Sequence, residues 1–173
     1  MLTLRAYNPA NDDDITAIAG IYAHHVLHGR ASFETEAPSV SEMRRRLDTL
    51  QEAGFPVLVA ELDGPLVGYA YASPYHTRFA YRYTVENSIY VDHNLPRRGI
   101  GRALLTALLD QLRAADFQQV MAVIGDSNNA GSIELHRALG FRHVGTATDI
   151  GFKFGEYLDV VYMQLALQED STA

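Results

Sequence analysis

The stretch SIYVDHNLPRRGIGR, residues 88–102, decides the fold of this chain. It begins with residues typical of a strand and ends in a glycine-rich turn that opens an apolar repeat of helical spacing. Glycines at 99 and 101 let the backbone approach a ligand closely. The first N–H groups of a helix are unpaired and partly positive. The stretch therefore predicts a strand–loop–helix unit with an anion site of pyrophosphate size at its turn.

The glycine loop also has a purely structural interpretation. A P-loop needs a Gly-Lys-Ser or Gly-Lys-Thr sequence, which does not follow here, and the dinucleotide fingerprint needs a third glycine that is missing. Gly99 and Gly101 would also suit a tight strand-to-helix turn that binds nothing. The loop alone leaves both interpretations open.

Outward from this unit, apolar periodicity predicts the remaining elements. Strands are expected at residues 2–7, 56–62, 66–73, 84–91, 118–124, 141–151 and 157–165. Helices are expected to begin near Asp12, at the Ser39/Glu42 capping box, at Ile100 and near Asn129. Asp63-Gly64 marks a hairpin. The order βααβββαβαββ predicts an α/β fold whose mixed, mostly antiparallel sheet is flanked by helices.

Composition limits the class of protein. The 173 residues suit one domain, expected at residues 1–167, with a short polar tail at 168–173. A net charge of −7 disfavours nucleic-acid binding, which depends on Lys and Arg. No apolar run approaches the ~20 residues of a membrane span, and the N-terminus lacks a signal-peptide pattern. Without cysteine, disulfides and a thiol nucleophile are excluded. We expect a cytoplasmic protein that binds neither nucleic acid nor a membrane.

Further motifs give the glycine loop its context. Those that resemble the GNAT acetyltransferases are SIYV at 88–91, RRGIGRALL at 97–105, and Asn129-x-x-Ser132 followed by LHRALGF at 135–141. Those that resemble the phosphinothricin and methionine sulfone/sulfoximine N-acetyltransferase branch are YRYTVENSIYV at 81–91, VIG at 123–125 and GFKFG at 151–155. The resemblance covers nearly the whole chain.

This resemblance implies a single-domain, GNAT-like N-acetyltransferase. Acetyl from acetyl-CoA would pass by direct attack to the primary amine of a small amino-acid-like substrate. The residues implied to bind acetyl-CoA are Ile89, Tyr90, Val91, Arg97, Arg98, Gly99, Ile100, Gly101, Arg102 and Asn129. One departure is Pro96, which has no N–H to donate where the family usually has Gln or Arg. Because this branch is commonly dimeric, a homodimer is also implied.

Amine acetylation needs proton transfer, because an aliphatic amine is mostly protonated at neutral pH. The resemblance implies that Glu86 is the general base, directly or through water; the alternative is a carboxylate paired with Arg82 or Arg78. It implies that His136, which replaces the Tyr of most family members, assists as an acid or base. The alternative for His136 is a structural histidine. Tyr90 is a third candidate.

The substrate pocket is expected to include Phe33, Arg78, Arg82, Tyr83 and Lys153. The planar fork of arginine suits a carboxylate or a phosphinate, and an α-amino acid carries a carboxylate beside its amine. The alternative for the two arginines is a solvated pair on a surface loop. Lys153 matches the branch motif.

Two other patterns are given structural roles. His24 and His28 have a spacing that suits a metal, but no accompanying carboxylate pattern, so we expect surface or packing roles and no metal. The arginines at 44–46 are expected to form a solvated helix face.

Two alternative functions stay open. One is an acetyltransferase for a peptide, protein or polyamine amine, and the other is a non-catalytic acyl-CoA-binding sensor. Pro96 favours the sensor, whereas the presence of both Glu86 and His136 argues against it. The aromatic-rich segment 75–83 favours a small closed pocket over an open peptide groove.

Overall fold

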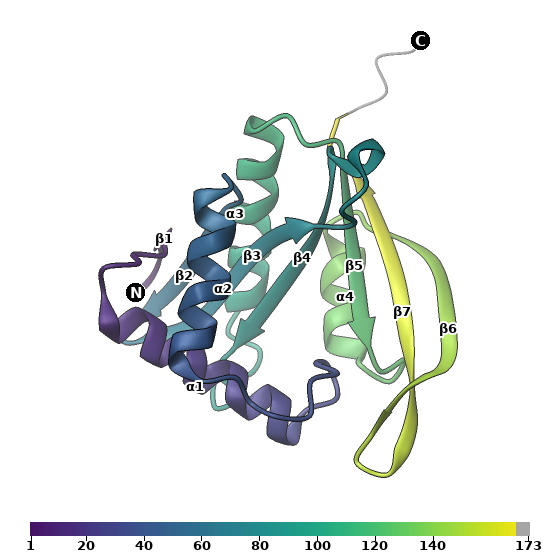
Figure 1. The fold of residues 1–173 in the computed structure, drawn as a ribbon, viewed down its shortest axis with the longest axis horizontal. Helices are drawn as coiled ribbons and strands as arrows, with labels where there is room; N and C mark the ends of the chain where they lie inside the picture. Colours follow the sequence, from purple (N-terminus) through teal and green to yellow (C-terminus); the bar gives the residue numbers. More distant parts are fainter. Residues whose placement is uncertain (169–173) are drawn as a thin grey trace.

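Alternating β-branched runs and periodic apolar residues form strands and helices in the predicted order (Figure 1). The computed structural model describes residues 1–168, so from residue 169 on the predicted polar tail lies outside the described residues. The strands are β1 (Leu2–Ala6), β2 (Val57–Leu62), β3 (Leu66–Pro74), β4 (Thr84–Val91), β5 (Gln119–Gly125), β6 (Arg142–Lys153) and β7 (Glu156–Ala166). The helices are α1 (Asp12–His28), α2 (Val40–Glu52), α3 (Ile100–Ala114) and α4 (Ala130–Ala138), with a 3₁₀ turn η1 (Phe79–Tyr81).

The seven strands form one sheet in the order β1-β2-β3-β4-β5-β7-β6. Every neighbouring pair is antiparallel except β4 and β5, which run parallel. The predicted mixed, mostly antiparallel sheet is therefore confirmed. Because β4 and β5 are parallel, they need a crossover, and α3 supplies it.

Helices cover both faces of the sheet, and each face has its own apolar core (Figure 1). On one face, α3 buries the leucine stripe that includes Leu104, Leu108 and Leu112. On the other, α1 and α2 pack against β2 and β3 through residues such as Ile15 and Leu47. The helical periodicity predicted for these segments is confirmed. Within residues 1–168, no helix is both long and apolar enough to cross a membrane.

Turn residues with positive φ close the hairpins. Asp63 (φ 53°) and Gly64 (φ 114°) join β2 to β3, as predicted. The strand predicted to end at residue 151 is longer in the structure, because β6 continues to Lys153. The chain then turns into β7 at Phe154 (φ 55°) and Gly155 (φ 77°).

The capping box that begins α2 is only half formed. Ser39 Oγ accepts a hydrogen bond from Glu42 N at 3.1 Å, as expected. The Glu42 carboxylate instead accepts from Arg45 and Arg46, both at 2.8 Å. The arginines at 44–46 are ion-paired, with partners Asp12, Glu34 and Glu42, and their side chains are 30 %, 67 % and 37 % exposed, which agrees with the solvated helix face expected there.

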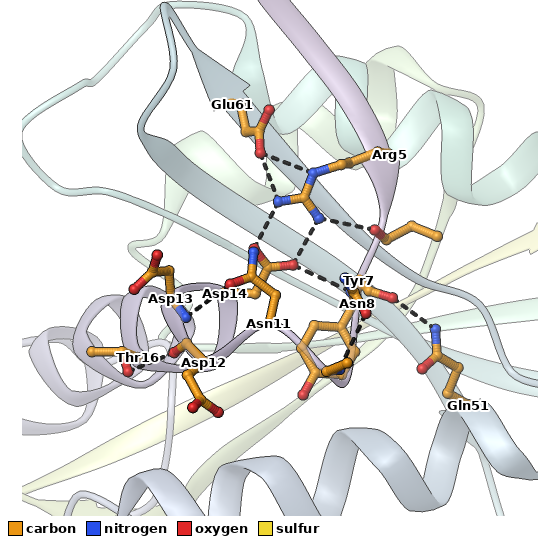
Figure 2. A network of polar contacts seen from close by, with 12 residues as sticks. Arg5, Tyr7, Asn8, Asn11, Asp12, Asp13, Asp14, Thr16, Gln51 and Glu61 are labelled. Carbon is orange, nitrogen blue, oxygen red and sulfur yellow. Dashed lines mark hydrogen bonds and ion pairs between the residues drawn. The ribbon is translucent and has the colours of Figure 1, made fainter.

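A partly buried ion pair ties β1 to the start of α1. Figure 2 shows Arg5 between Asp14 and Glu61, with two hydrogen bonds to Asp14 of 2.7 Å each. The carboxylate of Asp14 also accepts from Asn8 N and from Asn11 Nδ2, and its side chain is 3 % exposed. The hydrogen bonds from Arg5 lower the pKa of Asp14, even though burial alone would raise it. The network anchors α1, which carries residues of the site described below.

We expect Arg5→Ala to lower the free energy of unfolding by about 2 kcal/mol. The loss stays below that of a fully buried pair because Arg5 is 35 % exposed. Folding lowers the pKa of Asp14. The ion pair therefore contributes its full stability to the folded state when the pH is above the ordinary pKa of Asp, and this contribution is lost as the pH falls through the folded-state pKa. Urea denaturation at several pH values measures this. Arg45→Ala, at an exposed pair, should change stability little; equal losses in the two variants would contradict the assignment.

Candidate functional site

The parallel strands β4 and β5 separate partway along their length. They pair only at Thr84, Val85 and Glu86, opposite Gln119 to Met121, although both strands continue beyond. Figure 1 shows them diverging toward the end of the sheet where α3 begins. The result is a wedge-shaped gap, with its vertex just after Glu86, in which backbone groups lack a strand partner.

The alternation of β4 decides which groups face this gap. Thr84 O accepts from Tyr75 N and Asp92 N donates to Val67 O, so even-numbered residues direct their backbone polar groups toward β3. The β3–β4 register is continuous, so the backbone groups of Asn87, Ile89 and Val91 face the gap. Val91 O already lies 2.8 Å from His25 Nε2. The groups of this row that have no partner within residues 1–168, those of Ile89 among them, can pair with an extended, amide-containing ligand.

A cavity occupies the gap and is lined by residues from both faces of the sheet. Its lining includes the predicted residues Ile89, Tyr90, Val91, Gly101, Asn129 and His136. Lining residues that the sequence analysis did not propose are His25, Ala31, Asn87, Ala122, Val123, Ile124, Gly125, Gly131, Ser132 and Leu135. The structure therefore brings together β4, the first turn of α3 and α4. The predicted catalytic and cofactor-binding residues that do not line the cavity are Glu86, Arg97, Arg98, Gly99, Ile100 and Arg102.

The glycine loop forms the start of α3 at the wide end of the gap. Gly99 is the N-cap with φ 76° and no side-chain cap, so the first N–H groups of α3 lack a side-chain partner. Ile100 is 2 % exposed and packs in the core, so only its backbone is available to a ligand. Arg97, Arg98 and Arg102 are exposed beside this positive helix end. These features fit a diphosphate.

Glu86 lies at the vertex with its side chain on the α1/α2 face. Tyr90, four residues further along β4 and so on the same face, packs against the core of that face, which fixes this orientation. Burial raises the pKa of Glu86 above its ordinary value. No other described residue forms an ion pair or a hydrogen bond with its carboxylate, so the alternative pairing with Arg78 or Arg82 is not observed among residues 1–168. A raised pKa and a free carboxylate suit a general base.

His136 lies on the opposite face of the sheet, 3 % exposed on α4. Its Nδ1 is 2.7 Å from Ser132 O and its Nε2 is 2.9 Å from Asn87 Nδ2. Burial lowers its pKa, which favours the neutral ring. With both nitrogens engaged, this geometry is that of an orienting group rather than of a free proton donor.

Phe33 lies in the loop between α1 and α2, Lys153 at the end of β6 binds that loop, and neither residue lines the gap. Lys153, the single lysine of the sequence, is 4 % exposed and donates to Gly29 O (2.8 Å) and Ser32 O (2.6 Å). Its pKa is lowered by burial. The ring of Phe33 packs on Gly151 so closely that a Cβ there would lie 2.2 Å from it. Both residues hold the loop, whose Ala31 lines the gap.

The arginines predicted for the substrate lie at a separate pocket. Arg78 and Arg82 line it together with η1 residues, and it shares no lining residue with the gap. The guanidinium of Arg82 stacks between Phe79 (4.4 Å) and Tyr83 (4.5 Å). The structure therefore does not bring these two arginines or Tyr83 into contact with the gap.

The cluster of histidines near the wide end packs through ring contacts. His24 stacks on His93 at 3.4 Å and lies 4.9 Å from His28. His25, which the sequence analysis passed over, lines the gap, and its Nε2 is 2.8 Å from Val91 O. His25 follows His24 directly, and no periodic pattern in the sequence distinguished it from the other histidines of this helix.

Known proteins resemble this chain in sequence and in fold. The acetyltransferase (GNAT) domain family matches residues 8–162. Phosphinothricin N-acetyltransferase of Alcaligenes faecalis is 47% identical over 161 residues, which is 93% of this chain and 82% of that protein. The L-methionine sulfoximine/L-methionine sulfone acetyltransferase of Salmonella typhimurium is 38% identical over 160 residues (92% and 93%). The crystal structure of a phosphinothricin acetyltransferase from Sinorhizobium meliloti in complex with AcCoA superimposes with a TM-score of 0.93 at 42% identity, covering 99% of this chain and 91% of that one.

Proposed function

Because the chain belongs to the GNAT acetyltransferase family and is an acetyl-CoA-dependent N-acetyltransferase, we propose that it acetylates the primary amine of a small amino-acid-like substrate of the phosphinothricin or methionine sulfone/sulfoximine type. The observation that carries the proposal is the gap between β4 and β5, with the free carboxylate of Glu86 at its vertex. The names of the relatives support this substrate class.

The gap is lined from both faces, which suggests separate entry for the two substrates. The α3/α4 side, with Gly101 and Asn129, suits the acetyl-CoA arm, whose thioester supplies an activated acetyl group. The α1/α2 side, with His25 and Ala31, is left for the amine. In this arrangement the amine approaches on the face that carries Glu86.

Glu86 then accepts a proton from the ammonium group, directly or through a water molecule. The freed amine nitrogen attacks the thioester carbonyl and forms the new C–N bond, and the C–S bond breaks. The nitrogen loses its second proton as it becomes an amide, and this proton balances the one that the sulfur takes up to leave as a thiol. Burial helps Glu86 in this role, because it raises the pKa of the carboxyl toward the pH at which the enzyme works.

A substrate panel tests the function. Thiol release from acetyl-CoA would be followed with L-methionine sulfone, L-methionine sulfoximine, L-phosphinothricin, a polyamine and an N-terminal peptide. We expect saturable turnover confined to the three amino-acid analogues. Turnover on the peptide or the polyamine alone would reject the substrate class while keeping the acetyltransferase activity.

We also propose that the chain forms a homodimer through the β6–β7 hairpin in the cytoplasm. Large apolar side chains that are about half exposed or more gather on this hairpin: Val144, Ile150, Phe152, Phe154 and Tyr157. Exposed apolar groups gathered in this way favour a protein interface. The location in the cytoplasm rests on a separate observation: a sequence without cysteine suits a reducing compartment. Cell fractionation tests this location.

We expect the double variant Phe152→Asp, Tyr157→Asp to be monomeric where the wild type is dimeric, because the two rings are 62 % and 66 % exposed and 5.0 Å apart. Sedimentation velocity measures the oligomeric state. Phe79→Asp removes a comparable ring, 79 % exposed, outside the hairpin and should leave the dimer intact. A monomeric wild type, or a dimeric double variant, would reject this interface.

A further inference from the structure

Asn87 lies at the vertex of the gap and has an unsatisfied polar atom. It is the first residue of β4 beyond the last pair with β5, and its side chain points to the α4 side, where it is 6 % exposed. Its Nδ2 lies 2.9 Å from His136 Nε2, whereas its Oδ1 has no hydrogen-bond partner.

The hydrogen bonds of His136 fix the orientation of this amide. Ser132 O can only accept, so the Nδ1 that faces it at 2.7 Å carries the proton. In the neutral ring, Nε2 is then an acceptor and requires a donor, which among residues 1–168 only the Nδ2 of Asn87 supplies. A flipped amide would place two acceptors against each other. The amide oxygen is therefore directed away from His136.

A buried acceptor without a donor is costly, by about 1–3 kcal/mol. Within residues 1–168 there are two such side-chain atoms, Asn87 Oδ1 and Tyr69 Oη. Of these two residues, Asn87 lines the gap and Tyr69 does not. An unsatisfied acceptor beside a ligand cavity is expected where the ligand itself supplies the donor.

We propose that Asn87 binds acetyl-CoA, with its Oδ1 accepting a hydrogen bond from the pantetheine amide N–H nearest the thioester, and that His136 is the positioning residue that orients it. The inference rests on the cofactor placement proposed above. Amide N–H groups are the donors that the arm carries, and the vertex is where its reactive end lies. His136 then acts through Asn87 rather than by transferring a proton.

Binding measurements test this without turnover. Calorimetry would compare coenzyme A with adenosine 3′,5′-bisphosphate, which lacks the pantetheine arm. We expect Asn87→Ala to weaken coenzyme A binding about tenfold and to leave the bisphosphate unaffected. Met43→Ala, which removes a buried side chain of α2 that does not line the gap, controls for lost stability and should bind both ligands normally. Unchanged coenzyme A affinity in Asn87→Ala, or an equal loss for both ligands, would overturn the inference.

A double-mutant cycle tests the role of His136. We expect His136→Phe to weaken coenzyme A binding in the same direction, and the double variant to bind about as well as Asn87→Ala alone, because the two residues act as one unit. Fully additive losses would overturn the positioning role. A wild type that does not bind coenzyme A would instead reject the proposed cofactor site itself.

Discussion

Glu86→Gln is expected to lower kcat/KM by about 10²-fold or more, the scale of general-base assistance. Glutamine keeps the size of the side chain but replaces the carboxylate, which accepts the amine proton, with an uncharged amide. Glu86 has no ion pair with another described residue, so the substitution breaks no salt bridge and its main effect should be on catalysis. Acetyl-CoA affinity should therefore stay near that of the wild type.

The pH dependence distinguishes a base from a structural carboxylate. A base works only when deprotonated, so wild-type kcat/KM should fall as pH falls through the pKa of Glu86, which burial raises above its ordinary value. In Glu86→Gln this limb of the profile should disappear. Glu52→Gln, at an exposed position at the end of α2, is the control and should show the wild-type profile. If kcat/KM of Glu86→Gln still falls at acidic pH as in the wild type, Glu86 is not the general base.

The parts of the site that sequence predicted best are those formed by local pattern. The strand at 84–91, the turn at Gly99 and the leucine stripe of α3 lie in one continuous stretch, so their order along the chain is also their order in space. Asn87 was within reach of the same reasoning. The two-residue period of a strand places its side chain on the face of Ile89 and Val91.

Residues whose roles depend on distant partners were harder to predict. Phe33 and Lys153 were expected to line a substrate pocket, but their contacts are with Gly151 and with carbonyl groups of residues 29 and 32. Arg82 was expected at a carboxylate and stacks on aromatic rings instead. No periodicity in one segment determines which segment of β6 packs against the loop after α1. These are tertiary contacts, and only the assembled sheet defines them.

The loop between α1 and α2 packs on Gly151 of β6 through the ring of Phe33. We expect Gly151→Ala to lower kcat/KM for the amine about ten- to hundredfold while leaving coenzyme A binding near wild type. An ideal Cβ at Gly151 would lie 2.2 Å from Phe33 Cε2 and 2.6 Å from Cδ2. The methyl group must therefore displace the ring.

Phe33 packs on Gly125 and Gly151 and is 38 % exposed on its other side, so a displaced ring moves toward solvent and pulls on its loop. At Gly125, on the end of β5, a Cβ would come within 2.9 Å of Phe33 Cε1 and of Ala31 O, so the loop already lies against that strand. Lys153 holds the loop backbone from β6. A shift of Phe33 should thus move Ala31, which lines the amine side of the gap.

Steady-state kinetics with varied amine and with varied acetyl-CoA would measure the change. Gly145→Ala is the matched control, because it adds the same methyl group to the same strand where no atom lies within 4 Å. Loss of activity in both variants would point to a general effect on β6, and wild-type activity in Gly151→Ala would mean that Phe33 and its loop do not shape the amine site. An effect confined to Gly151→Ala would show that the amine side of the gap depends on a loop held by β6, a strand at the far edge of the sheet.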